Sequence, residues 1–344
     1  MGASSRVRFY QYLPYFESRG FKITVAPFFD DDYITSLYSN SKRVSLFRIA
    51  AWYLRRIRFL LSARQYDLLW VEKELLPWVP AWIEGSLLSR RTKIVVDYDD
   101  AVFHRYDRHS RFFVRALLRY KIDEVMRKAD LVIAGNEYIA QRAQKAGAAH
   151  VEIIPTVVDL EHYSCSSSEH DGPLVVGWIG TPGTSHYLRI IAKALSKIVE
   201  RRIGTVVAIG AGSNPVPGVP VQVIPWREET EVDEIQRIDV GIMPLPDLSW
   251  ERGKCGYKLI QYMACGKPVV ASPIGVNAKI IDQGVNGFLA DTEKEWIEAL
   301  EALYQDPLLR QRMGSEGRKR VEALYSLQVT APKLEALLNS TVMA

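Results

Sequence analysis

The stretch Gly253–Ser272 reads GKCGYKLIQYMACGKPVVAS and joins a glycine-containing loop, an amphipathic helix, a Gly-Lys-Pro turn and a short buried strand. The loop glycines let backbone amides approach a ligand, and the helix start presents unpaired N–H groups and a positive dipole end. Lys254 and Lys258 stand four residues apart on one face of that first turn. These groups suit an anion, most simply a diphosphate. Solvated lysines on a surface helix are the alternative that the stretch leaves open.

Outward from this stretch, strand-like runs alternate with helical runs along the whole chain. The alternation predicts parallel sheets with crossover helices. We expect strands at Ile23–Pro27, Leu68–Val71, Lys93–Val96, Leu131–Ala134, Val151–Ile154, Leu174–Ile179, Thr205–Ile209, Val221–Pro225, Val240–Pro244, Pro268–Ala271 and Gly287–Ala290. We expect helices at Val44–Ser62, Pro77–Leu88, Phe112–Lys128, Glu137–Ala146 and Glu228–Gln236, one that ends near Arg201, and three at the end of the chain, the last at about Leu327–Leu338.

The pattern starts again after a polar, serine-containing stretch from Glu161 to Gly172, which is the best candidate for a linker. A chain of 344 residues also favours about two domains. We therefore expect two similar α/β domains, at residues 1–165 and 172–326, with a C-terminal helix at 327–344 that packs back toward the first. Such a pair implies a cleft, and ligands of parallel sheets lie at the carboxyl ends of strands.

The composition is that of a soluble globular protein, with 48% apolar and 24% charged residues. Three scattered cysteines lack metal-binding spacing and favour a reducing compartment. The sequence shows neither a secretion signal nor an apolar run of about 18 residues, so we expect a cytoplasmic location.

Basic residues are concentrated between Lys42 and Arg64, where seven of them alternate with apolar residues and no acidic residue occurs. This pattern is typical of a helix that lies on an anionic membrane, so we expect peripheral contact with the inner membrane face through residues 42–64. A helix packed on its own domain, with its arginines in water, is the alternative. The net charge of only +4 and the absence of a recognition module argue against nucleic acid.

Four segments of the second half resemble the nucleotide-sugar domain of GT-B glycosyltransferases, specifically the retaining family 4 in a branch common in bacterial surface-polysaccharide loci. They are Gly177–Pro182 with Thr184 and Tyr187-Leu188, Lys254–Ser272, Ser272–Asn277 and Gly284–Leu289. The first-half segments that look like the same branch are Arg6–Arg8 with Gln11–Pro14, Asp97–Ala101, and Ile153–Pro155 with Val158-Asp159. The resemblance covers nearly the whole chain and implies two Rossmann-like, doubly wound parallel-sheet domains facing each other across a cleft.

The resemblance also implies roles for residues of the second half. Lys258 occupies the place of the basic residue that stabilises the leaving phosphate, and Gln261 the place of a glutamate that holds the ribose hydroxyls. Trp226 is expected to stack on the base, although a buried core tryptophan is equally consistent with the sequence. The residues expected to bind the donor are Gly180, Thr181, Pro182, Thr184, Trp226, Lys254, Gly256, Tyr257 and Gln261.

The sequence departs from the family pattern in three places. Paired glutamates would fall at 253 and 261, where this chain has Gly253 and Gln261, so Glu251 is the candidate to contact the transferred sugar. The basic pair usual after the Gly180 turn is replaced by Thr184, Ser185 and His186, which leaves Arg6 or Arg8 as further phosphate or acceptor contacts. The first domain also lacks the strand with which relatives open, so a neighbouring strand edge is expected to be unpaired.

Asp97-Tyr98-Asp99 also matches the metal-binding Asp-x-Asp of single-domain GT-A transferases. We reject this interpretation because the phosphate-type loops lie in the other half, where two lysines supply the positive charge. Asp99, Asp100 and His104 instead follow a strand and are expected on the acceptor side, where a base could orient or deprotonate a hydroxyl. Solvated acids and a structural histidine are the alternatives.

The leading hypothesis is therefore a glycosyltransferase that moves a sugar from a nucleotide-diphosphate sugar to a hydroxyl of a glycan or polyprenyl-linked acceptor, with retention, in cell-surface polysaccharide synthesis such as that of lipopolysaccharide. Lys258, Glu251, Asp99, Asp100 and His104 are its candidate catalytic residues. No metal and no other cofactor is expected. A nucleotide-sugar epimerase and a non-catalytic nucleotide-sugar-binding partner subunit are the alternatives.

Overall fold

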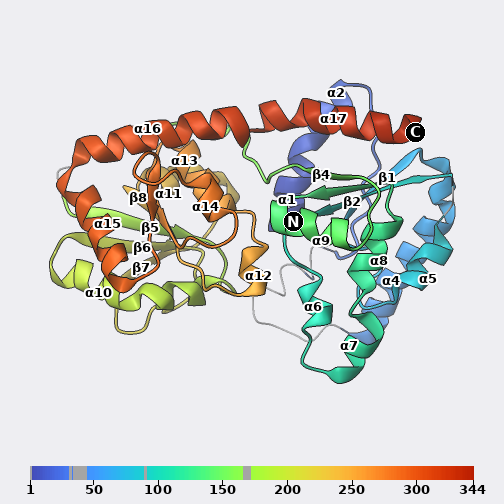
Figure 1. Ribbon diagram of the computed structural model, residues 1–344, viewed down its shortest axis with the longest axis horizontal. Helices are drawn as coiled ribbons and strands as arrows, with labels where there is room; N and C mark the ends of the chain where they lie inside the picture. Colours follow the sequence, from blue (N-terminus) through green and yellow to red (C-terminus); the bar gives the residue numbers. More distant parts are fainter. Residues whose placement is uncertain (1, 31–32, 34–44, 89–90, 166–171) are drawn as a thin grey trace. The chain divides into compact units, whose positions relative to one another are not determined.

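The computed structural model describes residues 2–30, 33, 45–88, 91–165 and 172–344. The chain forms two compact units: unit 1 consists of Met1–Thr156 with Ala331–Ala344, and unit 2 of Val157–Thr330. Each unit is built on one parallel sheet with helices packed on it (Figure 1), which confirms the fold class predicted from the alternation. Part of the predicted serine-containing linker, residues 166–171, lies outside the described residues.

Unit 1 contains a parallel sheet with the strand order β1-β2-β3-β4. The strands are β1 (Leu68–Glu72), β2 (Lys93–Tyr98), β3 (Leu131–Ala134) and β4 (Val151–Ile153). The helices are α1 (Ala3–Arg8), η1 (Tyr10–Tyr12), α2 (Leu13–Ser18), α4 (Leu46–Ser62), η2 (Ala63–Gln65), α5 (Ala81–Leu87), α6 (His104–Asp107), α7 (Phe112–Leu118), α8 (Lys121–Lys128), α9 (Glu137–Lys145) and the larger part of α17 (Leu327–Met343). All four residues of β3 are buried, as expected for a strand covered on both faces.

Two sequence predictions for unit 1 are wrong. Residues 23–27 form neither strand nor helix, because no described strand lies beside them to accept their hydrogen bonds. The helix predicted at Phe112–Lys128 is two helices, α7 and α8, which are separated at Arg119 and Tyr120. The break makes Lys121 the first residue of α8, where its side chain enters the interior.

Lys121 forms a buried ionic cluster with two acidic residues. Its Nζ lies 2.6 Å from Glu74 Oε2 and 2.8 Å from Glu84 Oε1, and it also donates to the carbonyl of Leu76. The Tyr106 hydroxyl donates to Glu74 at 2.8 Å. The cluster links the loop after β1 to α5 and α8, and one ammonium group lies between two carboxylates, with Arg105 Nη1 3.8 Å from Glu74 Oε1 as a further cation.

Unit 2 contains a parallel sheet with the order β10-β9-β8-β5-β6-β7. Its strands are β5 (Leu174–Ile179), β6 (Gly204–Ile209), β7 (Val221–Ile224), β8 (Val240–Met243), β9 (Val269–Ala271) and β10 (Gly287–Leu289). Its helices are η3 (Ser185–Ile191), α10 (Ala192–Glu200), η4 (Glu228–Thr230), α11 (Glu231–Gln236), α12 (Ser249–Arg252), α13 (Tyr257–Ala264), α14 (Asn277–Ile280), α15 (Glu293–Gln305) and α16 (Pro307–Leu324). The described part of the chain has no helix that is long and apolar enough to span a bilayer.

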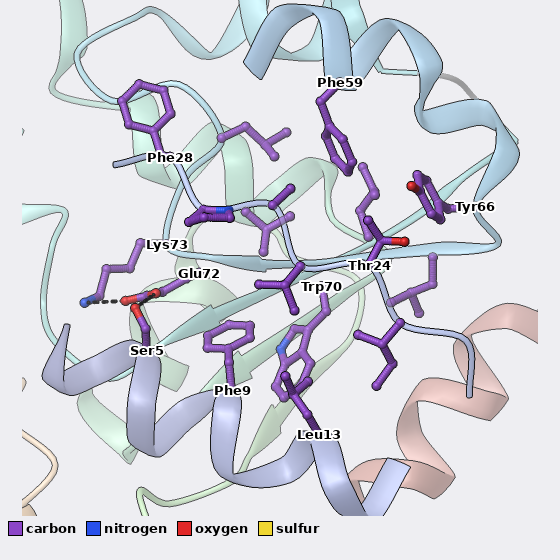
Figure 2. A pocket seen from close by; sticks show the side chains of 18 of the residues that line it. Ser5, Phe9, Leu13, Thr24, Phe28, Phe59, Tyr66, Trp70, Glu72 and Lys73 are labelled. Atoms are coloured by element: carbon purple, nitrogen blue, oxygen red, sulfur yellow. Dashed lines mark hydrogen bonds and ion pairs between the residues drawn. The ribbon is translucent and has the colours of Figure 1, made fainter. Parts of the chain in front are cut away.

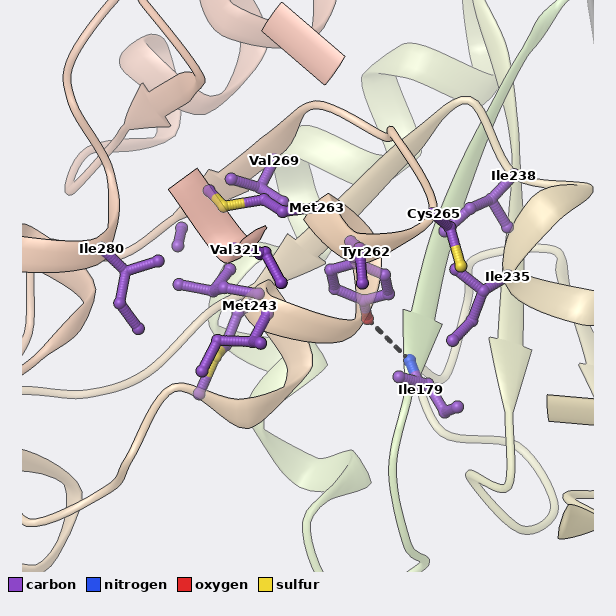
Figure 3. Close-up of a cluster of buried hydrophobic side chains, with 14 of the residues drawn as sticks. Ile179, Ile235, Ile238, Met243, Tyr262, Met263, Cys265, Val269, Ile280 and Val321 are labelled. Carbon is purple, nitrogen blue, oxygen red and sulfur yellow. Dashed lines mark hydrogen bonds between the residues drawn. The ribbon is translucent and has the colours of Figure 1, made fainter. Parts of the chain in front are cut away.

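The lysine-bearing helix α13 packs its apolar face on the sheet of unit 2. Leu259, Ile260 and Met263 are fully buried in a cluster with Ile179 and Val269, part of which Figure 3 shows. Full burial of side chains of this size contributes about 1.5–3 kcal/mol each. The helix is therefore held rigidly against β5, β8 and β9, and its first turn has a defined position.

The Lys121 cluster predicts a large loss of stability when its cation is removed. Lys121→Met removes the ammonium group that lies 2.6 Å from Glu74 and 2.8 Å from Glu84, and we expect the free energy of unfolding to fall by about 3–5 kcal/mol. Urea denaturation measures the change, with Lys145→Met on the exposed surface of α9 as the matched control. Equal stability of the two variants would contradict the cluster's role.

Candidate functional site

The loops after β5, β6 and β7 meet at the carboxyl edge of the unit 2 sheet. Gly210 has a φ of +74°, and a Cβ there would lie 2.3 Å from the carbonyl oxygen of Gly180 and 3.0 Å from Trp226 Cβ. The three loops are thus in close contact, and only a glycine at 210 allows it. Trp226 is 42% exposed, so its ring is not the buried core tryptophan that the sequence left open.

Lys258 lies beside the Gly180 turn. Gly256, with a φ of 66°, is the N-cap of α13 and turns the chain so that Lys258 stands in the first turn of the helix. The Lys258 Nζ lies 5.2 Å from the centroid of the Trp178 ring and 3.0 Å from the position that a Cβ on Gly180 would take. The structure therefore brings together the lysine and the glycine turn, which are far apart in the sequence.

Tyr262 fixes this arrangement from inside the unit. Its hydroxyl accepts a hydrogen bond from the Ile179 amide at 2.9 Å (Figure 3), and it donates to the Ile242 carbonyl at 3.4 Å. Tyr262 is fully buried, and burial raises the pKa of its phenol. The bond connects α13 to the last residue of β5, directly before the Gly180 turn.

The turn itself is organised by two threonines. The Thr184 hydroxyl accepts from the Thr181 amide at 3.3 Å and donates to the Thr181 carbonyl at 3.1 Å. The predicted helix after the turn begins as the 3-10 helix η3 and becomes α-helical only at Ala192. Pro182 and Gly183 form the exposed tip of the turn.

Glu251 and Lys254 precede α13 in the chain, and both lie next to Tyr187. The Tyr187 hydroxyl donates a hydrogen bond to Glu251 Oε1, and Lys254 Nζ lies 5.9 Å from the centroid of the Tyr187 ring. Glu251 is only 6% exposed, and its Oε2 is buried without a hydrogen-bond partner among the described residues. A buried carboxylate oxygen without a donor is costly, and a ligand hydroxyl would satisfy it.

Gln261 takes part in an internal polar network. Its Nε2 donates to the Tyr163 hydroxyl at 3.0 Å, and that hydroxyl donates to Glu231 Oε1 at 2.6 Å. Glu231 Oε2 accepts from Trp226 Nε1 at 2.7 Å. Burial, together with the neighbouring Tyr257 and Glu231, raises the pKa of Tyr163 well above its usual range. The network connects Gln261 to Trp226 through two intermediate side chains.

Asp97 and Asp99 face cationic side chains of unit 1. Arg8 Nε donates to Asp97 at 2.8 Å and its Nη1 to the Ile154 carbonyl at 2.8 Å, while Lys73 Nζ lies 3.1 Å from Asp99 Oδ1. Burial raises the pKa of Asp97 to about 6, with Arg8 opposing the rise. Burial also disfavours ionisation of Asp99, but Lys73 and neighbouring donors lower its pKa. Each carboxylate of the Asp-x-Asp motif thus has its own cation.

His104 is bonded through both ring nitrogens. Its Nδ1 lies 2.9 Å from Asp107 Oδ1 and its Nε2 lies 2.9 Å from the Tyr138 hydroxyl. This geometry favours the structural role that the sequence left open, because neither nitrogen is available to an acceptor hydroxyl. Asp100 is half-buried after β2, Arg6 is half-buried on α1, and Arg8 is buried in the Asp97 pair.

Three side chains of the hydrogen-bond networks in unit 2 were not predicted from the sequence as site residues. Tyr163, Tyr187 and Glu231 belong to the hydrogen-bond networks around Gln261 and Glu251. Tyr187 belongs to a matched motif, but nothing in the sequence pairs it with Glu251. Tyr163 lies in the polar stretch that was interpreted as a linker, and Glu231 lies at an acidic helix start. The sequence therefore predicts that both are surface residues. Within the described residues, no group of three or more acidic, His or Cys side chains could hold a metal ion.

Two family models match the chain in succession. The model described as "Glycosyltransferase Family 4" matches residues 7–162, and the model described as "Glycosyl transferases group 1" matches residues 173–306. The two matches correspond to the N-terminal part of unit 1 and to most of unit 2.

Individual relatives show sequence or fold similarity. D-inositol 3-phosphate glycosyltransferase from Arthrobacter sp. (strain FB24) is 40% identical over 100 residues, which are 28% of this chain and 23% of that protein. The chain thus aligns with about a quarter of the length of this curated relative. Anabaena Alr3699/HepE, solved with UDP and glucose, matches with a TM-score of 0.65 at 18% identity, over 83% of this chain and 81% of that one. A glycosyltransferase from Rickettsia africae matches with a TM-score of 0.68 at 13% identity, over 99% and 96%.

Proposed function

Because the chain belongs to the GT-B glycosyltransferases of the family 4 type, we propose that it transfers a sugar from a nucleotide-diphosphate sugar to an acceptor hydroxyl. The observation that carries the proposal is the position of Lys258, whose ammonium group lies beside the Gly180 turn at the carboxyl edge of the unit 2 sheet. A diphosphate at this edge would meet an ammonium group and the start of α13 together.

Lys258 is proposed to stabilise the leaving group. As the bond between the anomeric carbon and the diphosphate oxygen breaks, negative charge grows on that oxygen. A fixed ammonium group stabilises this charge more in the transition state than in the ground state. The burial of α13 and the Tyr262 hydrogen bond supply the required rigidity. Lys254 is proposed to add a second positive charge to the same diphosphate.

Glu251 is proposed to hold the transferred sugar, in place of the glutamate that the family pattern would have at 253. Its free Oε2 could accept a hydrogen bond from a sugar hydroxyl while Tyr187 holds Oε1. The nucleoside is proposed to lie over Trp226. The Gln261 amide donates a hydrogen bond to Tyr163 inside the protein. We therefore propose that Gln261 positions Tyr163 and Glu231 and does not bind the ribose directly.

The acceptor is proposed to be a hydroxyl of a glycan or a polyprenyl-linked glycan, in cell-surface polysaccharide synthesis. Asp99 and Asp100 are the candidates to orient this hydroxyl, and the lowered pKa of Asp99 keeps its carboxylate ionised at neutral pH. Retention of configuration is proposed from the family resemblance alone. An epimerase would release a free altered nucleotide sugar, and a binding subunit would give no product, so product analysis with a radiolabelled donor separates the three functions.

Peripheral membrane contact is proposed through α7 rather than through the arginines of α4. Arg55 and Arg56 donate to carbonyls of residues 26–28 of their own unit, which favours the structural alternative for that basic face. On α7, Phe112, Phe113 and Leu117 are 67%, 82% and 66% exposed. The stretch from Arg108 to Ile122 contains no acidic residue, and it includes Arg111, Arg115 and Arg119. Exposed aromatic side chains between arginines suit an anionic lipid surface, here proposed to be the cytoplasmic membrane face.

The first prediction concerns the diphosphate. Lys258→Ala should weaken uridine diphosphate binding by about 1.5–3 kcal/mol, the range for a hydrogen bond to a charged group, or roughly 10- to 150-fold in Kd. Calorimetric titration measures the affinity. Lys193→Ala, an exposed lysine on α10, is the control that should bind normally. Unchanged affinity in Lys258→Ala would remove this lysine from the site.

The second prediction concerns metal. Transfer is proposed to need no divalent ion, because lysines carry the charge at the diphosphate and the Asp-x-Asp carboxylates are paired with Arg8 and Lys73. Turnover measured with excess chelator should therefore match turnover without it. Loss of activity that Mn²⁺ restores would instead support a metal-dependent transfer through Asp97 and Asp99.

The third prediction concerns the membrane. The double variant Phe112→Ser with Phe113→Ser should lose binding to vesicles that contain anionic lipid, because it removes the exposed aromatic pair of α7. Leu46→Ser with Phe47→Ser removes a pair from α4 that is at least as exposed, at 81% and 89%, and is the matched control. Co-sedimentation measures binding. Full binding by the α7 variant would exclude this helix as the contact.

A further inference from the structure

The loop after β1 carries an exposed tryptophan in a strained conformation. β1 ends at Glu72, and Lys73, the next residue, lies beside it (Figure 2), with its Nζ 3.4 Å from Glu72 Oε1. Lys73 and Trp78 have φ values of 64° and 62°. For a bulky residue such a φ is an outlier, and it persists only where the surrounding structure imposes it. Trp78 is nevertheless 46% exposed, so burial of its ring does not account for the strain.

Four side chains from α4, α5, α6 and α8 bind the main chain of this loop around Trp78. The bonds run from Tyr53 Oη to the Pro77 carbonyl, from Lys121 Nζ to the Leu76 carbonyl, from Leu76 N to Glu84 Oε1 at 3.1 Å, and from Trp78 N to the Tyr106 hydroxyl at 3.0 Å. The four helices thus fix the loop on both sides of its tip. The interior of unit 1 therefore imposes the backbone conformation of Trp78.

The ring of Trp78 is also held, by two edge contacts. Its centroid lies 5.2 Å from that of Tyr106 and 5.6 Å from that of His109, at interplanar angles of 74° and 82°. Aromatic pairs favour this geometry at such separations. Together with the main-chain hydrogen bonds, these contacts fix the orientation of a ring that remains open to solvent.

Polar donors lie next to this ring. His109 Nδ1 accepts a hydrogen bond from the Arg111 amide at 3.0 Å, so the neutral imidazole carries its proton on Nε2. Arg105 Nη1 lies 3.8 Å from Glu74 Oε1, in the same loop as Trp78, and the Arg105 side chain is exposed. A pyranose has an apolar face of C–H groups and hydroxyl groups around its rim. An aromatic ring flanked by N–H donors matches both of these features.

The loop lies where ligands of parallel sheets bind, at the carboxyl end of β1. Lys73 Nζ lies 3.1 Å from Asp99 Oδ1, so the loop also reaches a carboxylate that is proposed to orient the acceptor hydroxyl. Lys73, Trp78 and Arg105 line the same cavity, which has a volume of about 1700 Å³. We propose that Trp78 is the stacking platform for a sugar ring of the acceptor glycan, an inference that rests on the proposed glycosyltransferase function.

The fixed orientation of Trp78 favours a glycan over a lipid surface. A group that is already held in its bound orientation loses less entropy when a ligand of defined shape binds. A lipid surface offers no partner of defined shape, so a strained and immobilised ring would gain nothing there. A pyranose stacks on an aromatic ring in a defined geometry, and the arrangement around Trp78 supports this occupant.

The test follows the Trp78 ring directly. The full chain is labelled with fluorotryptophan, and the Trp78 signal in fluorine NMR is identified by its absence in Trp78→Phe. Cellobiose, lactose and chitobiose are then titrated without any nucleotide sugar. At least one of them should shift the Trp78 signal, and Trp78→Ala should weaken binding of that sugar by about tenfold. No shift of the signal with any of the three sugars would overturn the proposal.

Two variants separate a binding role from a structural one. Trp82→Ala, which removes an exposed tryptophan of α5, is the matched control and should bind the sugar normally. Trp78→Gly removes the ring and the strain together, so its melting temperature should stay within about 3 °C of the parent while sugar binding is lost. A lower melting temperature with unchanged sugar binding would overturn the proposal. So would a Trp78 signal that responds to phosphatidylglycerol vesicles and to none of the sugars.

This outcome is separable from that of the proposed function. Sugar binding is measured without a donor, whereas transfer is measured as product formed from a nucleotide sugar. A response of Trp78 to a sugar, without product from any donor, would support the stacking platform and contradict the transfer. Product formed by Trp78→Ala with an unchanged KM for the acceptor sugar would overturn the stacking platform and leave the proposed transfer intact.

Discussion

The hydrogen bond between the Tyr262 hydroxyl and the Ile179 amide is the constraint on which the candidate site depends. It joins α13 to the end of β5, and the apolar face of α13 makes the junction rigid. Lys258, one helical turn before Tyr262, is then held next to the Gly180 turn. A flexible lysine at the surface would have to be ordered on binding, whereas this one is already held at the place proposed for the diphosphate.

Several charged residues of unit 1 form ion pairs in or near its interior. Arg8 of α1 pairs with Asp97, Lys73 with Asp99, and Lys121 of α8 with Glu74 and Glu84. Breaking any of these pairs leaves a buried charge, which is why they are expected to persist. The carboxylates of the Asp-x-Asp motif thus take part in local ion pairs, and the groups proposed to bind the diphosphate lie in unit 2.

The sequence predicted the periodic elements, and the family resemblance assigned Lys258 and the Gly180 turn to one donor site. The sequence did not predict contacts that depend on a distant partner. The strands from Leu68 to Gly287 were predicted within one or two residues, because most of them are buried parallel strands, which are continuous apolar runs. Residues 23–27 have the composition of a strand but no described neighbour to pair with. The pairing of His104 with both Asp107 and Tyr138, and of Gln261 with Tyr163, joins residues whose contact no local pattern encodes. The pairing of Glu251 with Tyr187, 64 residues apart, is of the same kind.

The central claim is that the carboxyl edge of the unit 2 sheet holds a diphosphate through Lys258. The most direct measurement is a crystal structure with a bound nucleotide-diphosphate sugar. We expect a diphosphate oxygen within about 2.7–3.2 Å of Lys258 Nζ, beside the Gly180 turn. A diphosphate bound elsewhere, with that ammonium group surrounded by solvent, would contradict it.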